Sequence, residues 1–102
     1  MNRYFKVEGD IIYPDQTLLT WGPFYYHYKD KAIERMSDIL NDIINWVNFQ
    51  DPTLDIKPTN IINMKTQIVF QIKAWKNDNE LQNCNGIIEV EPFDFEDKIR
   101  II

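Results

Sequence analysis

Residues 31–48, KAIERMSDILNDIINWVN, decide the fold that this sequence predicts. Apolar residues recur through the segment at intervals of three and four, which is the spacing of one face of an α-helix. These residues are Ile33, Met36, Leu40, Ile43 and Val47, and Ile39, Ile44 and Trp46 widen the stripe. The segment therefore predicts an amphipathic helix roughly 27 Å long. Its apolar stripe is broad enough for the helix to pack across a sheet.

The residues around this segment indicate where the helix begins and ends. Asp30 precedes the segment and is a candidate N-cap, because its carboxylate can accept hydrogen bonds from free backbone amides. Downstream, Asp51-Pro52 and Lys57-Pro58 each stop a helix, and they bracket a predicted loop.

The chain before the helix is typical of β-structure. Apolar and charged residues alternate across residues 3–13, with an interruption at Gly9-Asp10. This pattern indicates either one long strand with a bulge at Gly9 or two short strands around a turn. Residues 18–21 and 24–28 predict two further β-stretches, separated by Gly22-Pro23.

The second half of the chain is also predicted to form strands. Residues 64–75, MKTQIVFQIKAW, alternate between apolar and polar, as expected for a long strand with one buried face. Residues 77–80 predict a turn, and residues 87–91 a return strand. Because Asn85-Gly86 is a strong turn signal, residues 81–84 are expected to form a separate short strand or a bulged hairpin arm.

Strands, one long helix and further strands together predict an α+β fold. We expect one long amphipathic helix packed on an antiparallel β-sheet, in roughly β(β)-β-α-β-β order. The final residues, 93–102, fit either a short helix or a further strand. With 102 residues, 44% of them hydrophobic, residues 1–102 are expected to form a single compact domain.

The overall charge limits the partners that the chain is expected to bind. Sixteen acidic residues against eleven Lys and Arg give a net charge of −5. Nucleic-acid binding depends on Lys and Arg that neutralise phosphates, so no direct binding to DNA or RNA is expected. No apolar stretch approaches the ~20 residues of a membrane span and no signal-peptide pattern is present. We therefore expect a cytoplasmic protein that does not bind membranes.

The side chains of common catalytic sites are scarce. Cys84 and His27 are the only thiol and imidazole, and Ser37, the only serine, falls on the polar side of the predicted helix. A Cys84–His27 pair would need the two groups within hydrogen-bond reach, and no basic residue flanks the cysteine to activate it. We therefore expect a protein that is not an enzyme.

Metal and cofactor sites are not expected either. The three glycines form neither G-x-G-x-x-G nor G-x-x-x-x-G-K-[ST], the motifs that cradle phosphates. One cysteine and one histidine build no Cys/His metal cluster. The acidic residues near the C-terminus offer no more than a loose site for a divalent ion.

The best candidate for a binding surface is residues 19–28, LTWGPFYYHY, which hold five of the fourteen aromatic residues and the histidine. Alternation along a strand sends only about half of such a run into the core, so we expect the rest to lie at an interface. Trp21, Tyr26 and Tyr28 are expected to be exposed. The candidate partner-binding residues are Trp21, Phe24, Tyr25, Tyr26, His27 and Tyr28.

Acidic residues near the C-terminus form a second candidate surface. They are Glu89, Glu91, Asp94, Glu96 and Asp97, and they have fewer basic neighbours than the row Glu34, Asp38 and Asp42 on the predicted helix. Carboxylates grouped in this way can steer association with a basic protein surface.

Three functions fit these features. The first is a small acidic protein-binding module that occludes a partner with a basic surface: an inhibitor or antidote, such as a phage-type counter-defence protein or a toxin-immunity protein. The second is a small-ligand-binding domain with an aromatic-lined pocket between sheet and helix. The third is a structural or virion subunit that forms a homodimer or larger homo-oligomer through its sheet edges.

Overall fold

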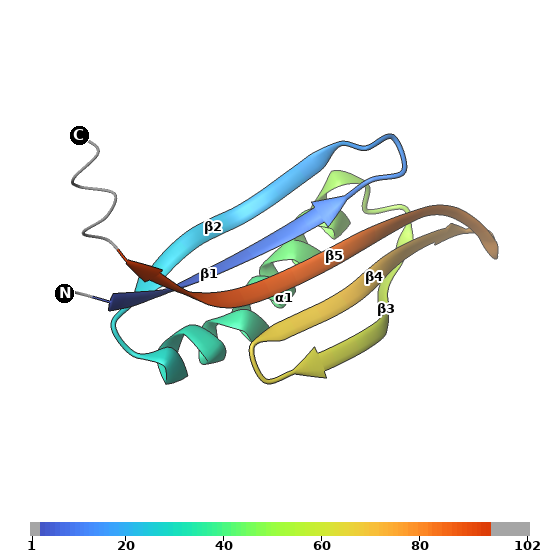
Figure 1. The fold of residues 1–102 in the computed structure, drawn as a ribbon. Coiled ribbons are helices and arrows are strands. Elements are labelled where there is room, and N and C mark those ends of the chain that lie inside the picture. Colours follow the sequence, from blue (N-terminus) through green and yellow to red (C-terminus); the bar gives the residue numbers. More distant parts are fainter. Residues whose placement is uncertain (1–2, 95–102) are drawn as a thin grey trace.

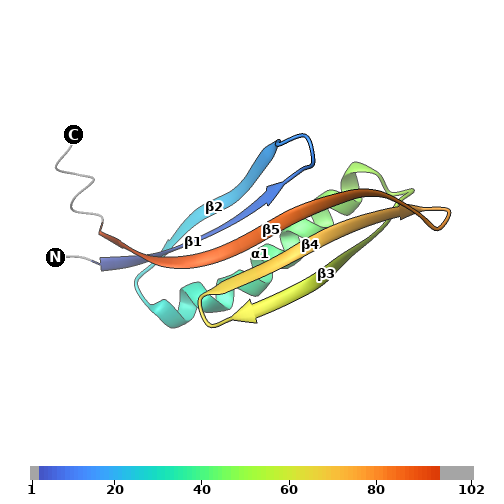
Figure 2. The same ribbon diagram turned by 45° about the vertical axis from the view of Figure 1, so that its right-hand side comes forward.

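A computed structural model describes residues 3–94, which form five strands and one helix (Figures 1 and 2). In chain order the elements are β1 (Arg3–Ile12), β2 (Leu18–Tyr26), α1 (Lys29–Gln50), β3 (Asp55–Met64), β4 (Gln67–Lys76) and β5 (Asn79–Asp94). The strands form one sheet in the order β2-β1-β5-β4-β3, and every neighbouring pair is antiparallel. The α+β fold predicted from the sequence is therefore confirmed.

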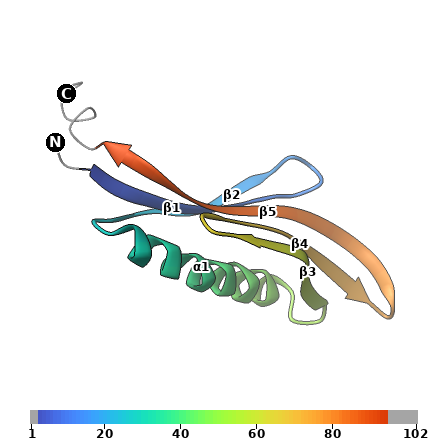
Figure 3. The same cartoon turned by 60° about the horizontal axis from the view of Figure 1, so that its bottom comes forward.

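The sheet and the helix form two layers. Helix α1 follows β2 at one edge of the sheet and leads to β3 at the other edge, so it crosses the sheet on one side. No other described element covers the opposite side, which we call the open face (Figure 3). No helix within residues 3–94 combines the length and apolarity needed to cross a membrane.

The core lies between α1 and the covered face of the sheet. Helix α1 buries one residue per turn, and the predicted alternation of β4 is confirmed, since every second residue of that strand is buried. The buried residues of these two elements are Ala32, Met36, Ile39, Ile43 and Val47 of α1, and Ile68, Phe70, Ile72 and Ala74 of β4. Strands β1 and β5 add Val7, Ile11, Cys84, Ile88 and Val90.

The start of α1 differs from the prediction. The helix begins at Lys29, its N-cap is Tyr28, and no side chain caps it. Asp30 lies in the first turn, where it is already helical and so cannot serve as the extended N-cap residue. Its carboxylate still lies near the positive end of the helix dipole, which is a favourable position for an acidic group.

Strands β1 and β2 show where the predicted irregularity lies. Strand β1 is continuous through Gly9, whereas β2 carries one extra residue, because Val7 pairs with Phe24 and Gly9 with Trp21. The two predicted β-stretches are thus one strand, with its irregularity around Gly22-Pro23. Gly9 lies where the helix comes close, since a Cβ there would stand 2.6 Å from Cγ2 of Ile39.

The region after the helix holds a strand that the sequence did not predict. Strand β3 begins inside the expected loop and continues to Met64, and the expected long strand at 64–75 is divided by a turn at residues 65–66. Strand β3 lies at the sheet edge, and Ile56 is its one buried residue. An edge strand with so little burial lacks the clear alternation that marks β4.

The predicted turn at Asn85-Gly86 is wrong. Both residues lie inside β5, and residues 81–84 belong to the same strand. Gly86 is required there because any Cβ would collide with the ring of Phe70. The turn predicted at 77–80 is confirmed in its first half: Asn77 and Asp78 adopt positive φ angles of 53° and 65° and connect β4 to β5.

Candidate functional site

The aromatic run divides between the two faces of the sheet. Trp21, Phe24 and Tyr26 are half-buried and face α1, where Trp21 meets the ring of Trp46 edge-on at 5.6 Å. The ring of Phe24 lies 4.7 Å from the guanidinium carbon of Arg35. The expected exposure of Trp21 and Tyr26 is therefore wrong, because the register of β2 against β1 turns both residues toward the helix.

The other aromatic residues of the run, Tyr25, His27 and Tyr28, lie at one end of the molecule. Tyr25 is 43% exposed on the open face, and its ring lies 5.1 Å from that of Phe93. His27 is exposed and its ring lies 4.8 Å from that of Tyr4. Tyr4 and Phe93 are register partners on β1 and β5. We call these four residues, Tyr4, Tyr25, His27 and Phe93, the aromatic end. Tyr28, at the start of α1, is 72% exposed, as expected.

Four carboxylates lie next to the aromatic end on the open face. Glu8 and Asp10 extend from β1, and Glu89 and Glu91 from β5. We call these four residues the acidic row. Glu8 and Glu89 are direct register partners, so two like charges stand opposite each other across neighbouring strands. Such a pair destabilises a sheet, and nothing in the packing of the fold requires it.

Neighbouring side chains hold three of the four carboxylates in place. Thr20 donates to Asp10 at 2.7 Å, and Gln67 donates to Glu89 at 3.0 Å. Glu91 forms an ion pair with Lys6 at 2.7 Å, and Lys6 is also the register partner of Tyr25.

Lys6 is the one cation among the open-face residues of β1 and β5 that the structure describes. The hydrogen bond to Glu91 raises the pKa of Lys6 above its usual value of 10.5, and the charges of Glu91 and Glu8 act in the same direction. The ammonium therefore stays protonated at neutral pH, and four carboxylates share this single counter-ion.

The predicted acidic residues are only partly placed by the structure. Glu89 and Glu91 lie on the open face, Asp94 ends β5, and Glu96 and Asp97 lie outside the described residues. The sequence did not single out Glu8 and Asp10. Their alternation with the apolar residues of β1 placed them on one side of a strand, but it did not say which strand pairs with β1.

The acidic residues on α1 have a different environment. Glu34, Asp38 and Asp42 are exposed on the side of α1 that points away from the sheet. Lys31 lies 3.6 Å from Glu34, and Arg35 lies 3.9 Å from Asp38. This surface therefore alternates in charge, unlike the acidic row.

The two residues considered for a catalytic pair lie far apart. His27 contacts Tyr4 at the start of β1, whereas Cys84 lies just beyond Asn85, the register partner of Ile12 at the other end of β1. Eight residues of strand span about 26 Å, so the imidazole and the thiol cannot form a hydrogen bond. Burial also raises the pKa of the Cys84 thiol. Within residues 3–94, no three His, Cys, Asp or Glu side chains group closely enough to hold a metal ion.

The aromatic run contributes little to the hollows of the surface. Trp21 borders a shallow one of about 240 Å³ with Leu19, Thr20 and Trp46. A larger one of about 450 Å³ lies at the C-terminal end of α1, and none of residues 21–28 lines it. This hollow lies between helix and sheet, and of the aromatic run, residues 19–28, Leu19 alone lines it.

The edge of the sheet formed by β3 changes in character along its length. Strand β3 carries Pro58, which cannot donate a ladder hydrogen bond, followed by an irregularity between Thr59 and Ile62. Within and beyond this irregularity, Ile61, Ile62 and Met64 are 48%, 57% and 44% exposed. Half of this edge is thus protected against pairing with another strand, and half is apolar and open.

No protein family, curated protein or solved structure matches the chain.

Proposed function

We propose that the chain is a non-catalytic protein-binding module whose open face docks onto a basic protein surface, and that it acts as an inhibitor or antidote by occluding that partner. The observation that carries this proposal is the Glu8–Glu89 pair. Natural sequences accept a local cost to stability mainly where function requires it. A basic partner would relieve the repulsion between the two carboxylates, so the cost disappears in the complex.

The neighbours of this pair support the same interpretation. Asp10 and Glu91 extend the negative charge along two strands, and hydrogen bonds already order their side chains, which lowers the entropy lost on binding. Tyr25 and Phe93 add an aromatic contact at one end of the acidic row. Tyrosine and phenylalanine are enriched in protein interfaces, where they supply apolar contact area. Charge for steering and aromatic rings for anchoring thus lie side by side.

The test compares two charge reversals. Tagged wild-type protein, the E8K/E89K variant and the control E34K/D42K are used to capture partners from a lysate of the native host at low and moderate salt. The face variant reverses the acidic row, and the control reverses the same number of charges on the outer side of α1. The two variants have the same net charge as each other, so a non-specific effect of charge would act on both alike.

We expect a single stoichiometric partner with wild type and control, and its loss with E8K/E89K. With the purified partner, the association rate at low salt should fall by about tenfold or more in the face variant. Equal capture by all three proteins would contradict docking through the open face. A stable homo-oligomer without any other partner would instead favour the structural-subunit hypothesis.

That third hypothesis has one observation in its favour, the apolar half of the β3 edge. If copies of the chain pair through β3, then Ile62→Lys should shift the oligomer toward monomer in light scattering. A wild-type protein that stays monomeric at high concentration would exclude it.

A further inference from the structure

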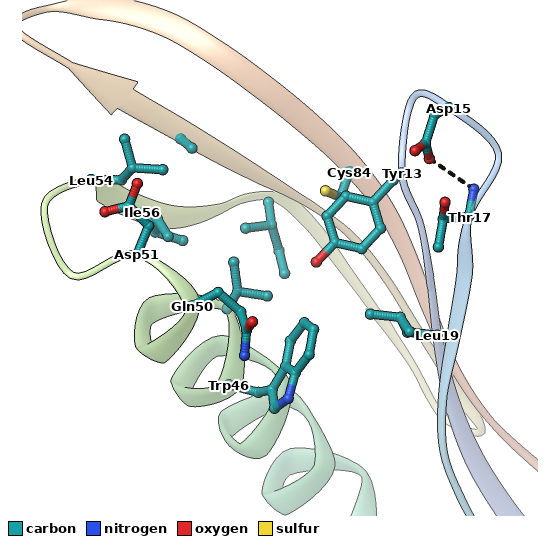
Figure 4. A pocket seen from close by; sticks show the side chains of 13 residues that line it. Tyr13, Asp15, Thr17, Leu19, Trp46, Gln50, Asp51, Leu54, Ile56 and Cys84 are labelled. Carbon is teal, nitrogen blue, oxygen red and sulfur yellow. Dashed lines mark hydrogen bonds between the residues drawn. The ribbon is translucent and has the colours of Figure 1, made fainter.

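A pocket of about 450 Å³ opens at the C-terminal end of α1, between the helix, the sheet and the β1–β2 turn (Figure 4). We call it the end pocket. Its volume lies within the roughly 300–1,000 Å³ of sites that bind small molecules. It lies on the helix side of the sheet, so it is separate from the acidic row and does not depend on the function proposed for the open face.

The walls of the end pocket are mainly apolar. Leu19, Val47 and Ile72 line it, together with the rings of Tyr13 and Trp46. In Figure 4 the hydroxyl of Tyr13 points into the space between helix and sheet. The hydroxyl of Tyr13 and the amide of Gln50 form no hydrogen bond with any residue in the described part of the chain. Both are therefore free to contact a ligand.

The mouth of the end pocket is negatively charged. Asp15, in the β1–β2 turn, and Asp51, at the end of α1, both line it. Hydrogen bonds from Thr17 lower the pKa of Asp15, and hydrogen bonds from Thr53 lower that of Asp51. Both carboxylates are therefore ionised at neutral pH.

The end of α1 adds to this charge. The C-terminus of a helix carries a partial negative charge from its free carbonyl groups, and the last turn of α1 contains no basic residue to offset it. Lys76 is close enough to lower the pKa of Asp51 and compensates in part. Burial raises the pKa of both Tyr13 and Cys84, and the charge of Asp15 acts in the same direction, so this charge reaches the pocket interior.

We infer that the end pocket binds a small organic cation, with its apolar body between Leu19, Val47 and Ile72 and its ammonium group at the mouth between Asp15 and Asp51. The rings of Tyr13 and Trp46 suit such a ligand, because aromatic faces attract cations. Neither an anion nor a purely apolar molecule would satisfy both the walls and the mouth.

The test uses three ammonium ions with different bodies: n-hexylammonium, 2-phenylethylammonium and 1-adamantylammonium. The matched neutral probes are the corresponding alcohols. Binding to the full chain is followed by calorimetry and by tryptophan fluorescence. Trp46 lines the pocket, so its emission should change when a ligand binds. At least one ammonium ion should bind saturably, with an affinity about tenfold higher than that of its alcohol.

Two variants separate the charge of the mouth from the shape of the pocket. In D15N/D51N each asparagine keeps an oxygen that can accept the local hydrogen bonds, so the turn and the helix end should stay folded. This variant should bind the ammonium ion no better than the alcohol. The control D38N/D42N removes two charges from the outer side of α1 and should keep the preference of the wild type.

Alkylation of Cys84 gives an independent readout. The thiol lines the end pocket, so the bound ammonium ion should slow its reaction with iodoacetamide, and the alcohol at equal concentration should do so less. Wild type and variants are compared by thermal melting, which shows whether each is folded.

The inference is overturned if none of the three ammonium ions binds saturably up to about 10 mM, or if the alcohols bind equally well. It is also overturned if D15N/D51N keeps the preference for the cation. A lysine-rich peptide that binds at the pocket while the small ions do not would assign the site to a protein ligand instead.

Discussion

Successive residues of the central strands β1 and β5 point to opposite faces of the sheet, and the two faces differ in burial and charge. On the covered face, Val7 pairs with Val90 and Gly9 with Ile88, and all four residues are buried. On the open face, between these pairs, Glu8 stands opposite Glu89. The covered face is arranged for stability, whereas the open face has a pairing that opposes it. This contrast is the reason for placing the proposed binding surface on the open face.

Replacing a core residue and its neighbour on the same strand should give the largest contrast between the faces. Phe70 is buried against Gly86, whereas Gln71 belongs to the open face. We expect Phe70→Ala to lower the free energy of unfolding by about 3–5 kcal/mol. Gln71→Ala loses exposed hydrogen bonds with Asn60 and Asn85 and should lower it by no more than about 1 kcal/mol. Urea denaturation measures both. Similar losses for the two variants would show that the open face also carries core packing.

Filling the space at Gly9 tests how closely the helix packs on the covered face. Gly9→Ala places a Cβ against Ile39 and should cost about 1–3 kcal/mol through overpacking. In the double variant with Ile39→Ala the shortest of the contacts, that with Ile39, is removed, so the combined loss should be smaller than the sum of the two single losses. Strictly additive losses, measured in the same urea titrations, would mean that the two positions do not touch.

Neutralising one member of the like-charged pair should act in the opposite direction. We expect Glu8→Gln and Glu89→Gln each to raise the free energy of unfolding by about 0.2–1 kcal/mol, because the repulsion across the strands is removed. The gain should shrink at high salt, which screens exposed charges. Glu34→Gln, on the outer side of α1, serves as the control and should give no gain. A loss of stability in either face variant would show that the pair is not repulsive.

The smallest effect should come from the ion pair at the border of the acidic row. The folded-state pKa of Lys6 is raised, so the contribution of the pair is present below the unfolded value near 10.5 and is lost as the pH rises through the folded value. Glu91→Gln should therefore reduce stability by a few tenths of a kcal/mol near pH 8. The gap between wild type and variant should close only as the pH rises past the usual lysine pKa of 10.5 and through the higher folded-state pKa. A gap that stays constant over this range would exclude Lys6 as its source.

The parts of the fold that the sequence predicted are those in which burial is periodic. In α1, Met36, Ile39, Ile43 and Val47 recur at helical spacing, and in β4 every second residue is buried. Strand β3 was missed because its position at the edge leaves Ile56 as its one buried residue. The turn predicted at Asn85-Gly86 was wrong because glycine occurs both in tight turns and where a side chain would collide with a neighbour. Here it makes room for the ring of Phe70 rather than reversing the chain.

For the acidic row, the sequence could predict which residues share one side of a strand, but not that the two strands lie next to each other. Alternation placed Glu8 and Asp10 on one side of a strand, and Glu89 and Glu91 on one side of another. Their meeting depends on the pairing of β1 with β5, whose residues are about eighty positions apart and whose register no local pattern encodes. The same register decides that Tyr25 faces outward and Trp21 inward. The end pocket was less predictable still, because Tyr13, Trp46 and Cys84 come from the β1–β2 turn, α1 and β5 respectively.

The pairing of β1 with β5 also sets how the molecule responds to force. Arg3 and Asp94 are register partners, so the two ends of the described chain leave the sheet side by side (Figure 1). The ladder hydrogen bonds between antiparallel strands run perpendicular to the strands. A pull on these two ends would load the bonds one after another, as in opening a zipper, rather than all at once in shear. The domain should therefore yield to tension at low force, even though the same central strands hold its best-packed core.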